Sequence, residues 1–164
     1  MKIAIVLNTS WNIHNFRMGL INALKEKGHE IVAIAPHDSY SNLLEEAGCE
    51  YRKVKMDSRG ASPIKDFALI FELLLIYRSV KPDVILHYTI KPNIYGTIAA
   101  SLLRIPVINN VCGLGTVFLN DNLVSKVAAF LYKVAFRFPK KVFFQNKDDL
   151  KLFSERKLIN PVIG

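Results

Sequence analysis

Short runs of mainly apolar residues alternate along this chain with longer segments in which apolar residues recur every three or four positions. The short runs are typical of buried strands, and the longer segments have the period of helices that cover a core. The strands are predicted at residues 2–6, 30–36, 49–54, 83–87, 106–111 and 141–145, and the helices at residues 16–27, 40–47, 64–80, 93–103, 123–138 and 147–156. This order predicts an α/β protein with a Rossmann-like parallel sheet and helices on both faces.

The length and composition fit one folded unit. The chain has 164 residues, of which 51% are hydrophobic and 22% are charged, so it can bury one core of ordinary size. We expect a single domain over residues 1–164.

No segment reaches the roughly 20 apolar residues of a membrane-spanning helix, because Glu72 interrupts the longest candidate, "FALIFELLLIY". The N-terminal "IAIVL" is shorter than the core of a signal peptide, so we expect a cytoplasmic protein. Cys49 and Cys112 are far apart, and the four histidines form no HExxH pattern. The sequence therefore predicts neither a disulfide nor a metal site.

The predicted topology places two loops beside each other. In an open parallel sheet, ligands bind at the carboxyl ends of the strands, where the strand order reverses. With the common order 3-2-1-4-5, the first and fourth strands are neighbours, and the loops at residues 8–15 and 88–93 face one crevice. We expect the binding site in this crevice.

The loop "NTSWNIHN" after the first strand lacks GxGxxG, which argues against a bound NAD or FAD. It offers amides, hydroxyls and an imidazole beside the flat ring of Trp11, a combination that suits the hydroxyl edges and C–H faces of sugars. The candidate hydrogen-bonding residues are Asn8, Ser10, Asn12, His14 and Asn15. In the alternative interpretation, Trp11 packs under the loop and the polar side chains cap the next helix.

The loop "YTIKPN" after the fourth strand has one charged residue, Lys91, and Asn93 is expected to cap the helix that follows. A lysine beside a helix N-terminus attracts phosphate. Arg59 and the backbone amides of "CGLG" follow other strands and could bind the same anion. The alternative is a solvated lysine beside an ordinary capped helix.

Four segments carry a resemblance to a known family: "NFRMGLINALKEKGHEI", "DSRGASPIKD", "YTIKPNIYG" and "INNVCGLGTVF". Together and in this order they resemble the N-terminal half of family 4 glycosyltransferases of the GT-B fold. The likeness covers almost all of the chain. It is greatest to enzymes that build bacterial capsular polysaccharide, O-antigen and related lipid-linked glycans.

The resemblance implies an acceptor-binding domain of a retaining, metal-independent hexosyltransferase. The nucleotide-sugar donor would be bound mainly by a C-terminal domain that this chain does not contain, and no other cofactor is implied. By position, the residues that line the acceptor side would be Asn12, His14, Asn15, Arg17, Arg59, Lys91, Asn93, Gly113 and Gly115. The resemblance assigns no catalytic residue to this half.

Residues 123–157 contain nine Lys/Arg and three Asp/Glu, so this region carries +6 of the formal net charge of +8. On a helix over residues 123–138, the stripe facing the core would consist of Leu123, Val127, Phe130, Leu131, Val134 and Phe138. The basic residues along its edge would be Lys126, Lys133 and Arg137, and the outward aromatics would be Tyr132 and Phe136. Such a face is typical of a helix at an anionic membrane surface.

Two alternatives exist for this basic region. Tyr132 and Phe136 could instead pack on a following segment or on the missing domain. Nucleic acid fits less well, because no nucleic-acid motif accompanies the charge.

Three functions fit these patterns. The first is the acceptor-binding half of a glycosyltransferase that works peripherally at the inner face of the membrane and moves a sugar from a nucleotide-sugar to a lipid-linked glycan. The second is a non-catalytic adaptor of a split GT-B enzyme, which binds the acceptor and recruits a separate donor subunit to the membrane. The third is a nucleotide-binding α/β domain of another kind.

Overall fold

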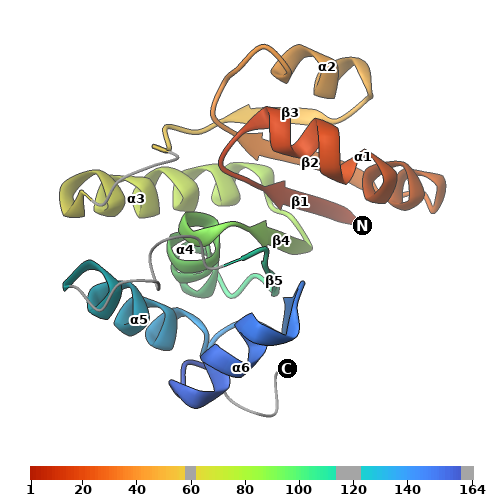
Figure 1. The fold of residues 1–164 in the computed structure, drawn as a ribbon. Helices are drawn as coiled ribbons and strands as arrows, with labels where there is room; N and C mark the ends of the chain where they lie inside the picture. The colour runs from red at the N-terminus through yellow and green to blue at the C-terminus, as the bar shows by residue number, and fades with distance from the viewer. Residues whose placement is uncertain (58–61, 114–122, 160–164) are drawn as a thin grey trace.

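The computed structural model describes residues 1–57, 62–113 and 123–159, and its centre is a parallel six-stranded sheet (Figure 1). The strands are β1 (Lys2–Val6), β2 (Glu30–Ala35), β3 (Glu50–Lys53), β4 (Val84–Tyr88), β5 (Val107–Val111) and β6 (Lys141–Phe144). The helices are α1 (Ser10–Glu26), α2 (Ser41–Glu46), α3 (Pro63–Val80), α4 (Thr97–Leu102), α5 (Leu123–Ala135) and α6 (Lys147–Glu155), and the π-helical turn η1 (Pro92–Gly96) precedes α4.

The strand order is β3-β2-β1-β4-β5-β6, with β1 paired to both β2 and β4. The predicted fold class is confirmed, as is the adjacency of the first and fourth strands. Because the chain reverses its direction of travel between β3 and β4, the carboxyl ends of β1 and β4 border the switch point of the sheet.

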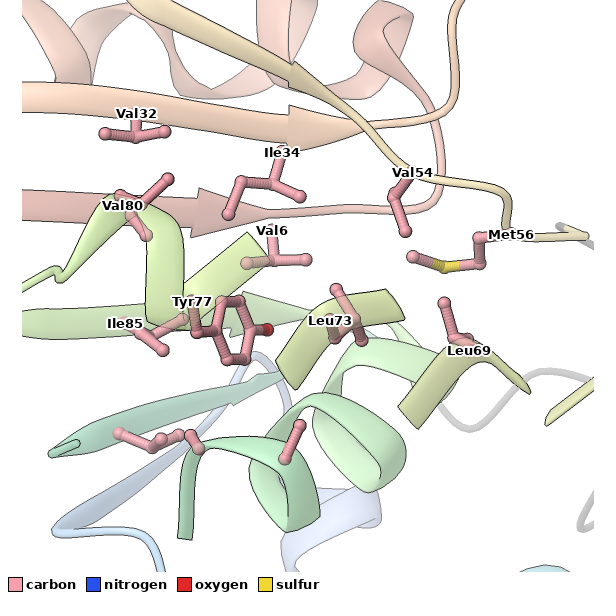
Figure 2. Packing of buried hydrophobic residues seen from close by; sticks show 14 residues of the cluster. Val6, Val32, Ile34, Val54, Met56, Leu69, Leu73, Tyr77, Val80 and Ile85 are labelled. Carbon is pink, nitrogen blue, oxygen red and sulfur yellow. The ribbon is translucent and has the colours of Figure 1, made fainter. Parts of the chain in front are cut away.

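Alternate residues of the central strands face opposite sides of the sheet. Ile3 and Ile5 belong to the apolar cluster beneath α1 and α2, whereas Val6 belongs to the cluster beneath α3 and α4. Figure 2 shows the second cluster, in which Leu73 and Tyr77 of α3 lie against the sheet. Right-handed crossovers explain this division, because α1 and α2 follow strands added in one direction and α3 and α4 follow strands added in the other.

Helix α1 begins at Ser10, six residues before the predicted start at Phe16. Thr9 has an extended backbone, and its hydroxyl oxygen accepts a 3.1 Å hydrogen bond from the N–H of Asn12, so Thr9 is the N-cap. Most of the polar segment that we predicted as a loop therefore forms the first turns of the helix.

The predicted orientation of α5 was wrong. Tyr132 and Phe136 are only 1% exposed and pack on Phe153 of α6, with ring centroids 5.1 and 5.7 Å from the Phe153 ring. Phe130, which we placed in the core, is 65% exposed, and Val127 is also exposed. Tyr132 and Phe136 belong to one buried apolar cluster with Ile94 of η1 and Phe153 of α6. The alternative in which they pack on a following segment is therefore confirmed.

The three basic residues that we placed along the edge of the α5 stripe, Lys126, Lys133 and Arg137, are exposed as predicted. None of the helices in the described part of the chain is both long enough and apolar enough to cross a membrane.

Candidate functional site

The carboxyl edge of the sheet brings together residues from α1, β4 and β5. The Arg17 guanidinium lies over the ring of Tyr88, 4.3 Å from the ring centroid, and its Nη2 lies 3.6 Å from the sulfur of Cys112. The side-chain amide of Gln145 donates to the same sulfur at 3.3 Å. Arg17 Nε is buried and has no hydrogen-bond partner among the described residues. Arg17 therefore lies at the predicted crevice.

Lys91 forms an ion pair that the sequence did not predict. Its Nζ lies 2.8 Å from a carboxylate oxygen of Asp66, and the two side chains are only 15% and 10% exposed. The Tyr95 hydroxyl donates to the other oxygen of Asp66 at 3.0 Å. Burial and the neighbouring Asp66 charge raise the pKa of Tyr95, so its hydroxyl stays protonated as a donor. The alternative of a freely solvated lysine is therefore wrong.

The backbone just before Lys91 is strained. Thr89 has a φ of 64°, in the left-handed region that a β-branched residue rarely adopts. Its hydroxyl donates to the carbonyl of Tyr88 at 2.5 Å. Strain of this kind persists only where the surrounding structure enforces it, and it is frequent at functional sites.

A fully buried polar network lies beneath this turn. Tyr77 of α3 and Asn109 of β5 bind the two ring nitrogens of His87, at 2.8 and 3.1 Å. Thr97 of α4 donates to Asn109 at 3.1 Å. Burial lowers the pKa of His87 to about 3, so the ring is neutral. The network joins β4, β5, α3 and α4, the elements that carry the Lys91 turn.

Asn93 does not have the predicted capping role. It is 1% exposed inside η1, and its side-chain amide donates to the backbone carbonyl of Asn110 at 2.9 Å. The prediction failed because the chain forms a π-helical turn from Pro92 instead of an ordinary helix start. Asn93 therefore holds η1 against β5. Its effect on the crevice is to position Lys91, which directly precedes η1.

A groove of about 550 Å³ opens at the carboxyl ends of β2 and β3, beside the first turns of α3. Its charged or imidazole-bearing lining residues are His37, Lys53, Lys55, Asp57, Lys65, Asp66, Glu72 and Lys91. Its apolar lining includes Val54, Met56 and Leu69, which lie close together in Figure 2. The groove thus combines cations, hydrogen-bond acceptors and an apolar floor.

Two contacts order the rim of this groove. Lys65 lies 2.9 Å from Asp57, and this hydrogen bond lowers the pKa of Asp57 and raises the pKa of Lys65. Glu72 accepts a 3.0 Å hydrogen bond from the backbone N–H of Lys55. We did not predict Lys53 or Lys55 as site residues, although the alternation "KVKM" after the third strand could have indicated them: both lysines are exposed, and Val54 and Met56 are buried.

The other predicted residues of α1 have different surroundings. Asn12 is half-buried and bonded to Asn8 at 3.0 Å, and Asn15 is exposed and donates to the carbonyl of Trp11 at 2.9 Å. His14 lies toward α2, with its ring centroid 5.4 Å from that of Tyr40. The structure therefore does not bring His14 to Lys91.

Ser10 and Trp11 differ sharply in exposure. Ser10 is fully buried and bonded to the Pro36 carbonyl, so it is not open to a ligand. Trp11 is 42% exposed, with the Phe16 ring against it at 5.4 Å, and its ring remains accessible.

The glycine-bearing segment is described only in part. Gly113 lies two residues after the end of β5 and has a φ of 103°, a conformation that favours glycine. Arg59 and Gly115 lie outside the described residues. Within the described ranges, no group of three His, Cys, Asp or Glu side chains is placed to hold a metal ion, and Cys49 and Cys112 are both free.

A family model described as glycosyl transferase 4-like matches residues 2–146. The chain belongs to this family. A relative is the N,N'-diacetylbacillosaminyl-diphospho-undecaprenol alpha-1,3-N-acetylgalactosaminyltransferase of Campylobacter jejuni, which is 29% identical over 154 residues, or 91% of this chain and 41% of the relative. The resemblance predicted from the four segments is thereby confirmed.

Solved structures share the fold. Anabaena HepE in complex with UDP-glucose has a TM-score of 0.69 at 15% identity, over 99% of this chain and 42% of HepE. Acinetobacter baumannii MurG has a TM-score of 0.63 at 19% identity, over 90% of this chain and 42% of MurG. The Neisseria meningitidis UDP-GlcNAc 2-epimerase bound to UDP-GlcNAc has a TM-score of 0.65 at 20% identity, over 94% of this chain and 44% of the epimerase. The chain spans less than half the length of each of these family members and neighbours.

Proposed function

We propose that this chain is the acceptor-binding half of a retaining glycosyltransferase that moves a sugar from a nucleotide-sugar to a lipid-linked glycan in bacterial surface polysaccharide synthesis. The proposal rests on the family, on the Campylobacter jejuni relative, which is named for a diphospho-undecaprenol acceptor, and on the groove at the carboxyl edge.

The groove is the observation that carries the proposal. A saccharide on a lipid diphosphate presents two phosphates beside sugar hydroxyls. Lys91, Lys65 and Lys55 offer ammonium groups that form charge-assisted hydrogen bonds with phosphate oxygens. Asp57 offers carboxylate oxygens that accept from sugar hydroxyls. Because Asp66 already holds Lys91 in place, less side-chain freedom is lost when the anion binds.

The nucleotide-sugar is assigned to a second domain. The loop between β1 and α1 contains no glycine, and Thr9 already satisfies the N–H of Asn12 at the start of α1. The end of β1 therefore lacks the close backbone approach that a nucleotide diphosphate needs. On this basis we expect the chain by itself to bind acceptor without turnover, since the described end of β1 does not orient a donor diphosphate.

We place the protein at the cytoplasmic face of the membrane, where a lipid-linked acceptor is available. The exposed Lys126, Lys133 and Arg137 attract anionic headgroups, each by roughly 1 kcal/mol. Phe130 and Phe138, not Tyr132 and Phe136, are the aromatic residues exposed near these three basic residues.

The test uses the full-length protein, a set of labelled UDP-sugars and an undecaprenyl-diphosphate-linked saccharide. We expect one sugar to be added to this acceptor and none to the same saccharide without its diphosphate. The coupling constant of the new anomeric proton reports whether the configuration of the donor is retained. Conversion of a UDP-sugar to its epimer without consumption of acceptor would contradict the proposal.

A further inference from the structure

Helix α3 has two apolar faces. Its buried face includes Leu69, Leu73 and Tyr77, which pack on the sheet. Its opposite face carries an outer stripe of Ile64, Phe67, Phe71 and Leu75, which are 85%, 63%, 54% and 64% exposed. Successive members are three or four positions apart and so form one row, about 16 Å long at 1.5 Å per residue. A helix that is apolar all round is normally covered all round.

The charged residues exposed on α3, α4 and α5 are all basic within the described part of the chain. They are Lys65, Arg78, Lys126 and Lys133. The acidic residues of these helices are Asp66, which is buried beside Lys91, and Glu72, which is half-buried and bonded to the Lys55 N–H. On the other side of the sheet, by contrast, α1 and α2 expose Glu26, Glu45 and Glu46.

Helices α3, α4 and α5 cover one side of the molecule in Figure 1, with η1 in contact with all three. The same helices expose further large apolar side chains, including Leu102 of α4 and Phe130 of α5, at 66% and 65%. Helices that expose apolar side chains, and whose own exposed charges are basic, are suited to a lipid surface that is apolar inside and anionic outside.

We propose that this side of the molecule docks on an anionic membrane, with the outer stripe of α3 inserted among the lipid headgroups and upper acyl chains. A second copy of the chain is a poorer occupant, because a twofold interface would bring basic residues against basic residues. The charge of this surface complements an anionic bilayer instead.

The position of the stripe also relates the membrane to the groove. Ile64 and Phe67 flank Lys65 and Asp66, which line the groove together with Lys91. Insertion of the stripe would therefore hold the groove at the level of the headgroups. A diphosphate attached to a membrane lipid emerges at that level, so this part of the inference rests on the proposed function.

The first test is co-sedimentation of the full-length protein with vesicles of phosphatidylglycerol and phosphatidylcholine, without any substrate. The variant Phe67→Gln/Phe71→Gln should bind roughly tenfold or more weakly, because burial of one phenylalanine changes partitioning by about that factor. The matched control is Phe16→Gln/Leu20→Gln, which removes two exposed apolar residues from α1, across the sheet. It should bind as the wild type does. Equal binding by all three proteins would overturn the inference.

A second test reports on insertion itself. Trp11, the single tryptophan of the chain, lies on α1, away from the stripe. In the variant Trp11→Phe/Phe71→Trp, brominated lipids should quench the emission of the new tryptophan, whereas they should leave wild-type Trp11 emission unchanged. Quenching of neither protein would contradict insertion of α3.

Other occupants give different results. If the stripe binds a second copy, Phe67→Gln/Phe71→Gln should convert a dimer to a monomer in sedimentation velocity with unchanged vesicle binding. If another domain of the protein covers it, the variant should lower the melting temperature, again with unchanged vesicle binding. A failure of the proposed function would give a different result. If that function is wrong, the wild-type protein should transfer no sugar to a water-soluble short-chain diphosphate acceptor. If it is right, Phe67→Gln/Phe71→Gln should retain this transfer.

Discussion

The ammonium group of Lys91 lies 2.8 Å from the carboxylate of Asp66, so the turn after β4 is joined to the first turns of α3 by a largely buried ion pair. The pair fixes the position of the one lysine that the sequence placed in the crevice. It also means that neither charge can be removed alone without leaving the other poorly solvated.

Replacement of Asp66 by Ala should lower the free energy of unfolding by about 3 kcal/mol, because Lys91 would remain buried without its partner. Urea denaturation measures this loss. The control is Asp57→Ala, which breaks an exposed pair with Lys65 and should cost far less, because water screens exposed charges. Similar losses for the two variants would show that burial does not distinguish the pairs.

Gly96→Ala should destabilise the protein by about 1–3 kcal/mol through overpacking. A Cβ at this position would lie 2.5 Å from His87 Nε2 and 2.9 Å from the Tyr77 hydroxyl, and both groups are held in the buried network. Gly19→Ala is the matched control, because nothing lies within 4 Å of its added carbon and alanine favours helix α1. Thermal melts should show a lower midpoint for the first variant and an unchanged or higher midpoint for the second.

His87 should make the protein less stable in mild acid. Its pKa is about 3 in the folded protein, because of burial, and near 6.5 in the unfolded chain, so the unfolded chain binds more protons between these values. Stability therefore falls as the pH drops through this window, by about 2 kcal/mol between pH 7 and pH 5. The stability of His87→Gln should lack this dependence on pH. The difference between the wild-type and His87→Gln profiles of unfolding free energy against pH, measured with urea, isolates the contribution of His87. Parallel profiles would contradict a buried neutral histidine.

Thr89→Asn should raise the free energy of unfolding by about 1 kcal/mol, because asparagine tolerates the left-handed conformation that Thr89 adopts. Denaturation by urea at neutral pH measures the gain. A destabilised variant would indicate that the hydroxyl bond from Thr89 to the Tyr88 carbonyl outweighs the backbone strain.

The sheet could be predicted from the sequence because its central strands, such as β1 and β2, are apolar on both sides and the strands are separated by helices of recognisable length. The start of α1 could not, because Ser10, Asn12 and Asn15 have the composition of a loop and only the hydroxyl bond of Thr9 reveals a cap. The face of α5 was misjudged for a related reason. Its apolar pattern allows two orientations, and only the aromatic contact with Phe153 decides between them.

The site could be located from topology but not assembled in detail. Lys91 and Arg17 lie at the predicted edge, yet the partner of Lys91 comes from α3, 25 positions earlier, and no local pattern indicates that pairing. The buried network was also missed. His87 and Asn109 are opposite each other in the pairing of β4 and β5, and two polar residues within apolar strands were the signal that could have indicated it.

The central claim, that this chain binds the acceptor diphosphate through Lys91, is tested most directly by steady-state kinetics of the full-length enzyme with Lys91→Met/Asp66→Asn. This double variant removes both charges of the buried pair and keeps an acceptor for the Tyr95 hydroxyl, so the fold should survive. Loss of one charge-assisted phosphate contact predicts an acceptor KM higher by roughly tenfold or more, with the KM for the nucleotide-sugar unchanged. An unchanged acceptor KM, or a rise confined to the KM for the nucleotide-sugar, would contradict the claim.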